Sequence, residues 1–431
     1  MKRSLMLSAF LAALSTASAA TEIRYGLWDS LQLPVYQQCA AAFQKQNPDI
    51  TVKIEQLGWS DYWTNLTTQM VTGDAYDVFT NHVSRYPGFV EQKQLVDLAP
   101  LVARDKVDLS VYYPSSLAPQ WVLGSARYGL PKDIGSEAVF YNADALTKAG
   151  VNPNIMNIWK WNPKGTGNFE NVVAKLSLDK NGNNGLSAKF DKNSVVQYGF
   201  AMNLPDWNGQ TGWGSLAASN GFKLQDKAFA GKYNYDDPRF LETIDWWKAL
   251  VAKGYAPPFK DLANNGVGQD ALFQAGKVAM MIEGNWNVAD LRKSKFKLGF
   301  GLLPSGTGVS KTIANGLADS IYAGSKHKEE AWKWVKFLAS PACATIVGNS
   351  GVVFPAQKVP AQLSIRAIQK SGLDASAFLK QQARGTWAYP IDQKTSEVTA
   401  IMGPVLQDYL QDKVGADAVK AAAAKVNALF K

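Results

Sequence analysis

Side chains that perform nucleophilic or zinc-dependent catalysis are scarce in this chain. His82 and His327 are its only histidines among 431 residues. Neither a Gly-x-Ser-x-Gly segment nor a His-Glu-x-x-His segment occurs, so a serine hydrolase triad and a catalytic zinc site are both disfavoured. Two carboxylates acting on a glycosidic bond need no local motif, so a secreted carbohydrate-active enzyme remains an alternative.

Aromatic side chains, in contrast, are abundant, with 14 tryptophans and 16 tyrosines. The C–H face of a sugar ring packs on an indole, while its hydroxyls pair with Asn, Asp and Gln. Trp247 and Trp334 lie at helix-core spacing and are expected to pack internally. Rings in glycine-rich turns with polar neighbours are better candidates for ligand contact. These candidates are Trp207, Trp213, Trp286 and Trp387, joined by Trp28 beside Asp29.

The elements that must position these rings alternate between strands and helices. Apolar periodicity predicts strands at 22–27, 51–57 and 76–80, with helices at 34–46 and 61–73 between them. This order implies a parallel sheet, which places ligand groups just past the carboxyl ends of its strands. Two of these ends carry Trp28-Asp29 and Asn81-His82.

A second α/β unit is predicted from Glu137 onward. It starts with a strand at 138–141 and continues with helices at 143–149, 169–178, 238–253, 265–275, 328–339 and 415–430. The loop at 299–308 lacks phosphate-loop spacing and is interpreted as a connection between lobes. About 410 mature residues exceed one ordinary core, so two lobes are expected.

The first 19 residues have the order of a secretory signal peptide. Lys2 and Arg3 precede an apolar run to Leu14, and small residues end at Ala19. Cleavage there predicts a periplasmic or secreted protein without a transmembrane anchor. Loss of Lys2 and Arg3 lowers the formal charge from +9 to +7. This mild, scattered positive charge does not indicate a nucleic-acid partner.

Cys39 and Cys343 are the only cysteines. An exported chain can oxidise them, and an even count leaves no orphan thiol, so a disulfide is predicted. The alternative is two buried thiols that are too far apart to bond.

A glycine-rich turn offers one potential metal site. Side-chain oxygens stand at alternate positions in Asp179, Asn181 and Asn183, followed by Asp191, much as in calcium loops. The glycine falls one position late and no glutamate closes the loop. A solvated turn is therefore favoured over a structural calcium site, and no other cofactor is predicted.

The order of segments resembles the family 1 extracellular solute-binding proteins of ABC importers, the group that includes maltose-binding protein. The most specific similarity is Phe-Gln-Ala-Gly-Lys-Val-Ala-Met at 273–280, followed by Gly-Asn-Trp at 284–286. Further similar segments lie at 43–52, 73–79, 129–131, 141–142, 331–338 and 354–355.

The resemblance implies two Rossmann-like lobes joined by a three-segment hinge, the periplasmic binding protein type II fold. Residues 20–133 and 305–351 would form the first lobe, and residues 134–304 and 352–431 the second. Cys39 and Cys343 would then share the first lobe, which favours the disulfide.

The resemblance also implies a function without catalysis. A monomer would capture a mono- or oligosaccharide between its lobes and deliver it to an ABC transporter permease. An anionic ligand such as a glycerol phosphate is the alternative, and it would require Arg or Lys where this chain has mostly Trp, Asn and Asp. The positions that match family ligand contacts are Trp28, Asp29, Asn81, His82, Asp133, Trp207, Trp213, Trp286, Asn315 and Trp387.

Overall fold

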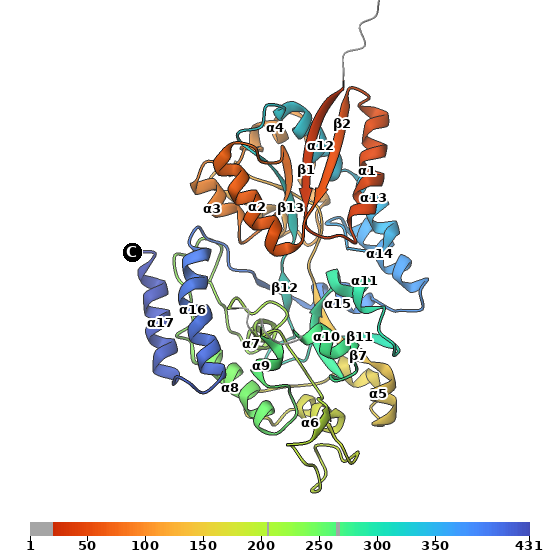
Figure 1. Ribbon diagram of the computed structural model, residues 1–431, viewed down its shortest axis with the longest axis vertical. Coiled ribbons are helices and arrows are strands. Elements are labelled where there is room, and N and C mark those ends of the chain that lie inside the picture. Colours follow the sequence, from red (N-terminus) through yellow and green to blue (C-terminus); the bar gives the residue numbers. More distant parts are fainter. Residues whose placement is uncertain (1–19, 205–206, 264–267) are drawn as a thin grey trace, which may run out of the picture.

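The computed structural model describes residues 20–204, 207–263 and 268–431. The chain forms two α/β lobes, one above the other in Figure 1. The signal peptide predicted at residues 1–19 lies outside the described residues, as does the start of the helix predicted at 265–275. Within the described ranges, no helix is long and apolar enough to cross a membrane.

The upper lobe is built on a five-stranded sheet in the order β2-β1-β3-β13-β6. Three strands are parallel as predicted, namely β1 (Thr21–Leu27), β2 (Ile50–Gln56) and β3 (Val78–His82). The other two are β13 (Leu317–Ile321) and β6 (Leu130–Pro131), and β13 runs antiparallel to both of its neighbours. The sheet is therefore mixed instead of parallel throughout, because β13 enters it only after the chain has returned from the other lobe.

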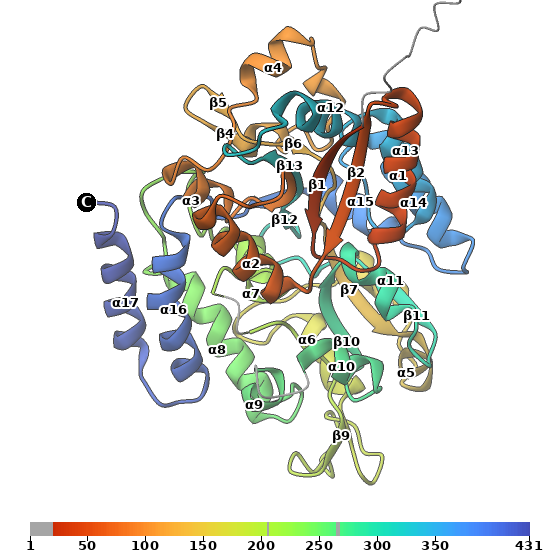
Figure 2. The ribbon, with the colours of Figure 1, turned by 45° about the horizontal axis from the view of Figure 1, so that its top comes forward.

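Helices cover this sheet, as Figure 2 shows. Tyr36, Cys39 and Phe43 of α1 point into the same buried cluster as Trp334 and Val335 of α12. The helices of this lobe are α1 (Leu33–Gln46), α2 (Trp59–Thr72), α3 (Tyr86–Glu91), α4 (Ala99–Arg104), α12 (Lys328–Leu338) and α13 (Pro341–Ser350). Short elements between α4 and β6 are η1 (Leu109–Val111), η2 (Ala118–Trp121), β4 (Val122–Leu123) and β5 (Ala126–Arg127).

The predicted disulfide is confirmed. Cys39 of α1 and Cys343 of α13 are bonded, with their Cα atoms 5.2 Å apart. Both are fully buried in the core of the upper lobe. The bond joins two segments that are 304 residues apart in sequence.

The lower lobe contains a three-stranded antiparallel sheet with β7 (Glu137–Asn142) in the middle. Its partners are β10 (Met280–Gly284) and β11 (Leu298–Gly301). Parallel bridges from Tyr198 to Val278 and from Ala201 to Met281 extend this sheet on the β10 side. One large buried cluster, which includes Trp159, Trp161, Trp213, Trp246 and Trp247, packs around it.

The described helices of the lower lobe are α5 (Ala143–Lys148), α6 (Asn168–Leu176), α7 (Trp213–Ser219), α8 (Pro238–Ala252), α9 (Phe259–Leu262), α10 (Gly268–Gln274), α11 (Val288–Leu291), α14 (Lys358–Gln369), α15 (Ser376–Arg384), α16 (Thr395–Leu410) and α17 (Ala416–Ala428). Five of them, α5, α6, α8, α10 and α17, match predicted positions within a few residues, and the other six were not predicted. The minor elements are η3 (Pro153–Asn157), β8 (Leu178–Asp179), β9 (Val195–Gln197) and η4 (Asn285–Asn287).

Segments from distant parts of the chain meet where the two sheets approach each other. Asp133 bridges to Pro355, and Gly135 bridges to Asn315. Close by, β12 (Thr312–Ala314) pairs in parallel with β14 (Thr386–Ala388). The residue boundaries of the lobes, 20–133 with 305–351 and 134–304 with 352–431, stay a prediction.

Candidate ligand-binding site

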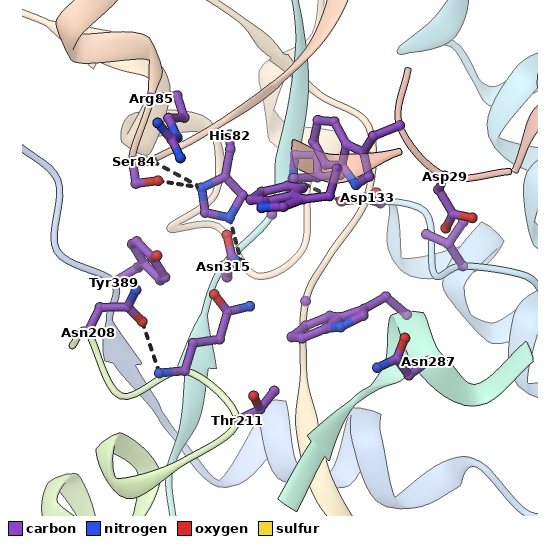
Figure 3. Close-up of a pocket in the computed structure, with 18 of the residues that line it drawn as sticks. Asp29, His82, Ser84, Arg85, Asp133, Asn208, Thr211, Asn287, Asn315 and Tyr389 are labelled. Carbon is purple, nitrogen blue, oxygen red and sulfur yellow. Dashed lines mark hydrogen bonds between the residues drawn. The ribbon is translucent and has the colours of Figure 1, made fainter. Parts of the chain in front are cut away.

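A cavity of about 870 Å³ opens between the two lobes. Its lining comes from the carboxyl ends of the upper strands, from the segments near Asp133 and Asn315 that connect the lobes, and from loops of the lower lobe. Figure 3 shows His82 and Asp29 on one side and Asn208, Thr211 and Asn287 on the other. The volume lies within the range of sites that enclose small ligands.

Most of the residues predicted to contact ligand are brought together here. Their side chains come from both lobes and from the segments at Asp133 and Asn315 that connect them, so one ligand could touch all three. The predicted residues in the lining are Trp28, Asp29, His82, Asp133, Trp207, Trp286 and Asn315.

Tryptophans form the wall of the cavity on the upper lobe. Trp28 follows β1, and its ring lies 5.0 Å from that of Trp59 at nearly a right angle. Trp63 supports Trp28 from behind, 5.4 Å away. Trp59 itself is 46% exposed, an unusually open position for so large an apolar ring. The wall therefore presents an accessible aromatic face to the cavity.

Trp59 is not among the residues that the sequence predicts to contact ligand. It follows β2 by three residues, so it too lies at the carboxyl end of a parallel strand. Applying the strand-end rule to this second strand would have identified Trp59.

Trp286 forms the opposing aromatic surface on the lower lobe. A Cβ atom on Gly284 would lie 2.2 Å from Cζ2 of this ring, and one on Gly135 would lie 3.0 Å from Cζ3. The ring therefore covers two glycine backbones. Asn285 fixes this arrangement, since its side chain accepts from the Ser136 N–H (2.7 Å) and donates to the Ile134 carbonyl (3.0 Å).

His82 provides a polar edge on the upper side. Its Nδ1 accepts the Ser84 N–H at 3.2 Å and lies 2.8 Å from the Ser84 hydroxyl. Its Nε2 lies 3.3 Å from the side-chain amide of Asn315 (Figure 3). Burial, with a smaller contribution from Arg85, lowers the pKa of His82 to about 3. The imidazole is therefore neutral at any physiological pH, and it can take part in hydrogen bonds without adding charge.

Asn315 shows an unused hydrogen-bonding capacity next to this histidine. The residue is 4% exposed, and its Oδ1 has no hydrogen-bond partner among the described residues. Buried polar atoms are normally paired, so such an atom in a cavity wall is suited to a polar ligand group.

Carboxyl groups outnumber cations around the cavity. Asp29, Asp133, Asp270, Glu283 and Asp290 all contribute to the lining, against Arg85 alone. Arg85 lies over the ring of Trp63, 5.3 Å from its centroid. It makes no ion pair with any described carboxylate. The electrostatic balance of the cavity is therefore acidic.

Burial shifts the pKa of several of these acids upward. It raises the pKa of Asp133 to about 6, although Lys132 and the Leu317 N–H, which donates to its Oδ1 at 2.9 Å, act in the opposite direction. Burial also raises the pKa of Glu283 well above its usual range, and the neighbouring Asp270 adds to this effect. Burial raises the pKa of Asp270 as well, and the two neighbouring carboxyl groups shift each other's pKa.

Three residues predicted to contact ligand, Asn81, Trp213 and Trp387, lie outside the lining of this cavity. Asn81 is fully buried, where it donates to Ser320 Oγ at 3.1 Å. Trp213 is 1% exposed and packs edge-on against Phe240, 4.7 Å away. Trp387 is also buried, and its Nε1 donates to Ser215 Oγ at 3.0 Å. The rings of Trp213 and Trp387 are both packed in the core, although each lies in a glycine-rich segment.

The lower lobe instead contributes polar side chains that sequence reasoning missed. Asn208, Gln210 and Thr211 follow Trp207 in the lining, and Tyr389 lies two residues beyond Trp387. The Tyr389 ring lies 5.3 Å from that of His82, so this tyrosine reaches the upper lobe. The polar composition of the turn after Trp207 was the available signal for the first group. No sequence pattern indicated Tyr389 as a ligand contact.

The calcium loop considered at residues 179–191 is better described as a hydrogen-bonded turn. Asp179 Oδ1 accepts the N–H groups of Asn181 and Asn183, and its Oδ2 accepts from the Asn183 side chain and the Asp191 N–H. Burial opposes ionisation, but these bonds outweigh it and lower the pKa of Asp179 to about 2. These four N–H donors occupy the lone pairs of the Asp179 carboxylate, which a bound cation would need. Nor do His, Cys, Asp and Glu gather in metal-binding groups of three or more within the described part of the chain.

Comparison with known families assigns the class of the protein. Residues 29–344 match the family model of the bacterial extracellular solute-binding proteins. The chain belongs to this family.

Particular relatives agree with this assignment. The chain is 24% identical to the maltodextrin-binding protein of Bacillus subtilis (strain 168), over 80% of this chain and 75% of that protein. It is 25% identical to the galactooligosaccharide-binding protein of the same organism, over 86% and 80% of the two chains. An ABC substrate-binding protein from Listeria monocytogenes, solved in complex with cycloalternan, has 22% identity and a TM-score of 0.79, with 95% and 99% of the two chains covered. The predicted two-lobed, type II periplasmic binding protein fold is confirmed.

Proposed function

We propose that this protein is an extracytoplasmic substrate-binding protein that captures a mono- or oligosaccharide between its lobes. It delivers the sugar to the membrane permease of an ABC transporter, acts as a monomer and catalyses no reaction. Export through the signal peptide predicted at residues 1–19 brings it to the periplasm or the extracellular space.

The observation that carries this proposal is the pair of aromatic surfaces on opposite lobes. Trp59 and Trp28 face the cavity from above, and Trp286 faces it from the lower lobe. Between them lie neutral hydrogen-bonding groups such as His82, Asn315 and Asn208. Stacking faces combined with amides and carboxylates match the two kinds of surface that a sugar presents.

The charge of the cavity favours an uncharged ligand over an anionic one. A phosphate or uronate would approach five carboxyl groups and a single arginine. Recognition of an oxyanion normally relies on Arg or Lys in bidentate geometry. Carboxylates accept hydrogen bonds from sugar hydroxyls, so the same residues suit a neutral sugar.

The carboxyl pair in the lower wall is not arranged like the catalytic pair of a glycosidase. The side chains of Asp270 and Glu283 lie close enough to shift each other's pKa. In glycoside hydrolysis the two carboxyl groups stand about 5–9.5 Å apart, because the sugar lies between them. Two carboxyl groups this close to each other leave no room for a sugar between them and cannot act on both sides of a glycosidic bond.

Binding would shift the molecule toward its closed form. A sugar that contacts Trp59 and Trp286 together interacts more strongly when the lobes are close, and this difference in affinity drives closure. The permease would then recognise the closed arrangement.

Titration with a sugar panel tests the proposal. The panel consists of maltotetraose, mannotriose, a galactooligosaccharide, lactose and glucose, with glycerol 3-phosphate as the anionic comparison. We expect at least one neutral sugar to change the tryptophan fluorescence and to raise the melting temperature, and glycerol 3-phosphate to do neither. If no neutral sugar changed the tryptophan fluorescence or the melting temperature, sugar binding would be refuted. Product release from an oligosaccharide during prolonged incubation would instead establish an enzyme.

A further inference from the structure

Thr211, in the lower wall of the cavity, has an unfavourable backbone conformation. Its φ is +51°, and it is the one β-branched residue with positive φ in the described ranges. A side chain branched at Cβ clashes with the backbone in the left-handed region, so the conformation persists only where surrounding contacts enforce it. Strain of this kind is often found where a loop forms part of a ligand site.

The contact that enforces it comes from Glu137, the first residue of β7. Glu137 is fully buried, and its Oε1 accepts the Thr211 N–H at 2.6 Å. The Thr211 carbonyl accepts the Asn203 N–H at 3.0 Å, which holds the peptide on the other side of this residue. The strained residue is therefore clamped between a carboxyl group and the backbone of Asn203.

The same carboxyl group continues into a longer hydrogen-bonded chain. The Ser215 hydroxyl, on α7, donates to Glu137 Oε2. Ser215 Oγ in turn accepts the indole N–H of Trp387 at 3.0 Å. The backbone N–H of Glu137 donates to Thr312 Oγ1 on β12 at 2.6 Å. Glu137 thus ties the loop that contains Thr211 to α7, β12 and β14 at once.

The loop held in this way lines the cavity. Asn208, Gln210 and Thr211 belong to the lining, and Asn208 Oδ1 accepts the Gln210 N–H at 2.9 Å (Figure 3). Glu137 itself does not line the cavity and can act on a ligand only through this loop. We infer that Glu137, together with Ser215, is a positioning residue that holds residues 207–211 in the conformation that binds sugar. This role rests on the proposed sugar-binding function.

Two matched serine substitutions separate positioning from general stability. Ser177 is fully buried in the same lobe, donates to the Val173 carbonyl at 2.9 Å and accepts the Gly199 N–H at 3.1 Å, but it lies outside the cavity lining. Ser215→Ala and Ser177→Ala each delete one buried hydroxyl. We expect Ser215→Ala to raise the Kd for the panel sugar that wild type binds best by about tenfold, and Ser177→Ala to leave it within about twofold. Equal Kd values for the two variants would overturn the assignment.

A double-mutant cycle tests the clamp on Thr211 directly. Glycine adopts positive φ without strain, so Thr211→Gly removes the need for enforcement. We expect Glu137→Gln to weaken sugar binding by about tenfold in the Thr211 background and by much less in the Thr211→Gly background. Fully additive effects would contradict a clamp.

Hydrogen exchange in the sugar-free protein separates a failure of this role from a failure of sugar binding. If wild type binds none of the panel sugars, the proposed function fails, and the clamp is still tested by the backbone amides of residues 207–216. We expect these amides to exchange about tenfold faster in Glu137→Gln than in wild type, and at the wild-type rate in Ser177→Ala. Unchanged exchange in Glu137→Gln would refute the clamp whether or not a sugar binds.

Discussion

Trp286 and Trp213 occur in similar sequence surroundings but lie in opposite environments. Each ring covers a glycine closely: a Cβ on Gly284 would lie 2.2 Å from the Trp286 ring, and one on Gly209 would lie 2.9 Å from the Trp213 ring. Trp286 is half-buried and faces the cavity, whereas Trp213 is 1% exposed among phenylalanines. A glycine beside a tryptophan thus indicates that the ring lies on backbone, but not whether its other face meets ligand or core.

One short segment supports both regions. Asp133, Gly135 and Glu137 are spaced by two, as along a strand, where alternate residues share a face. Asp133 lines the cavity, Gly135 lies under the Trp286 ring, and Glu137 anchors the loop and helix that carry Trp213. The ligand-facing and core-facing tryptophans are therefore coupled through the segment that connects the two lobes.

The largest expected effect is on the core side of this comparison. Trp213→Ala should lower the free energy of unfolding by about 3–5 kcal/mol, because it leaves a cavity in a tightly packed aromatic cluster. Urea unfolding measures the change. A loss below about 1 kcal/mol, accompanied by weaker sugar binding, would show that Trp213 contacts ligand after all.

Asp133 gives a pH-dependent effect on the cavity side. Because the pKa of its buried carboxyl is raised to about 6, the folded protein holds this proton more tightly than the unfolded chain does. The contribution of this group to stability is therefore fully present at pH below about 4 and is lost as pH rises through 6, a change of about 2–3 kcal/mol.

Asp133→Asn removes this titration while keeping an oxygen that can accept the Leu317 N–H. We expect the variant to be more stable than wild type at pH 7.5, with the difference shrinking toward pH 4. Urea unfolding at both pH values measures this difference. A difference that grows on acidification would contradict a raised pKa.

Trp286→Ala should act mainly on binding. Loss of a stacking surface is expected to cost about 2 kcal/mol of binding free energy, or a Kd about thirtyfold higher. The free energy of unfolding should change less than in Trp213→Ala, because one face of the ring is open to the cavity. Isothermal titration with the preferred panel sugar checks the first expectation. A wild-type Kd would exclude Trp286 from the site.

Sequence patterns predicted much of the fold and part of the site. Strand and helix positions around β1 to β3 follow from local apolar periodicity. Of the residues that the strand-end rule selected, Trp28, Asp29 and His82 line the cavity and Asn81 does not. Trp213 and Trp387 lie outside the lining, because the direction a ring faces depends on packing between segments far apart in sequence, such as Ser215 with Trp387. The antiparallel entry of β13 was missed because strand direction depends on the return of the chain from the other lobe.

A smaller effect is expected from the glycine under Trp286. Gly284→Ala would place a methyl group 2.2 Å from Cζ2 of the ring and force it to move. Gly284 has a φ of −91°, so the substitution introduces no backbone strain of its own. We expect a Kd increase of about fivefold, roughly 1 kcal/mol. Gly403→Ala in α16 is the matched control, since nothing lies within 4 Å of its added methyl, and it should bind sugar as wild type does.

The smallest effect separates the hydrogen bond of Trp387 from its ring. Trp387→Phe keeps an aromatic side chain on Gly214 but removes the N–H that donates to Ser215 Oγ. A lost buried hydrogen bond should reduce the free energy of unfolding by about 1 kcal/mol. Because Ser215 still reaches Glu137, the Kd for sugar should rise by no more than about threefold. Unfolding and titration measured on one preparation test both expectations. A loss of affinity as large as that of Trp286→Ala would show that Trp387 contacts the ligand. The contrast between Trp286 in the cavity and Trp213 and Trp387 in the core would then fail.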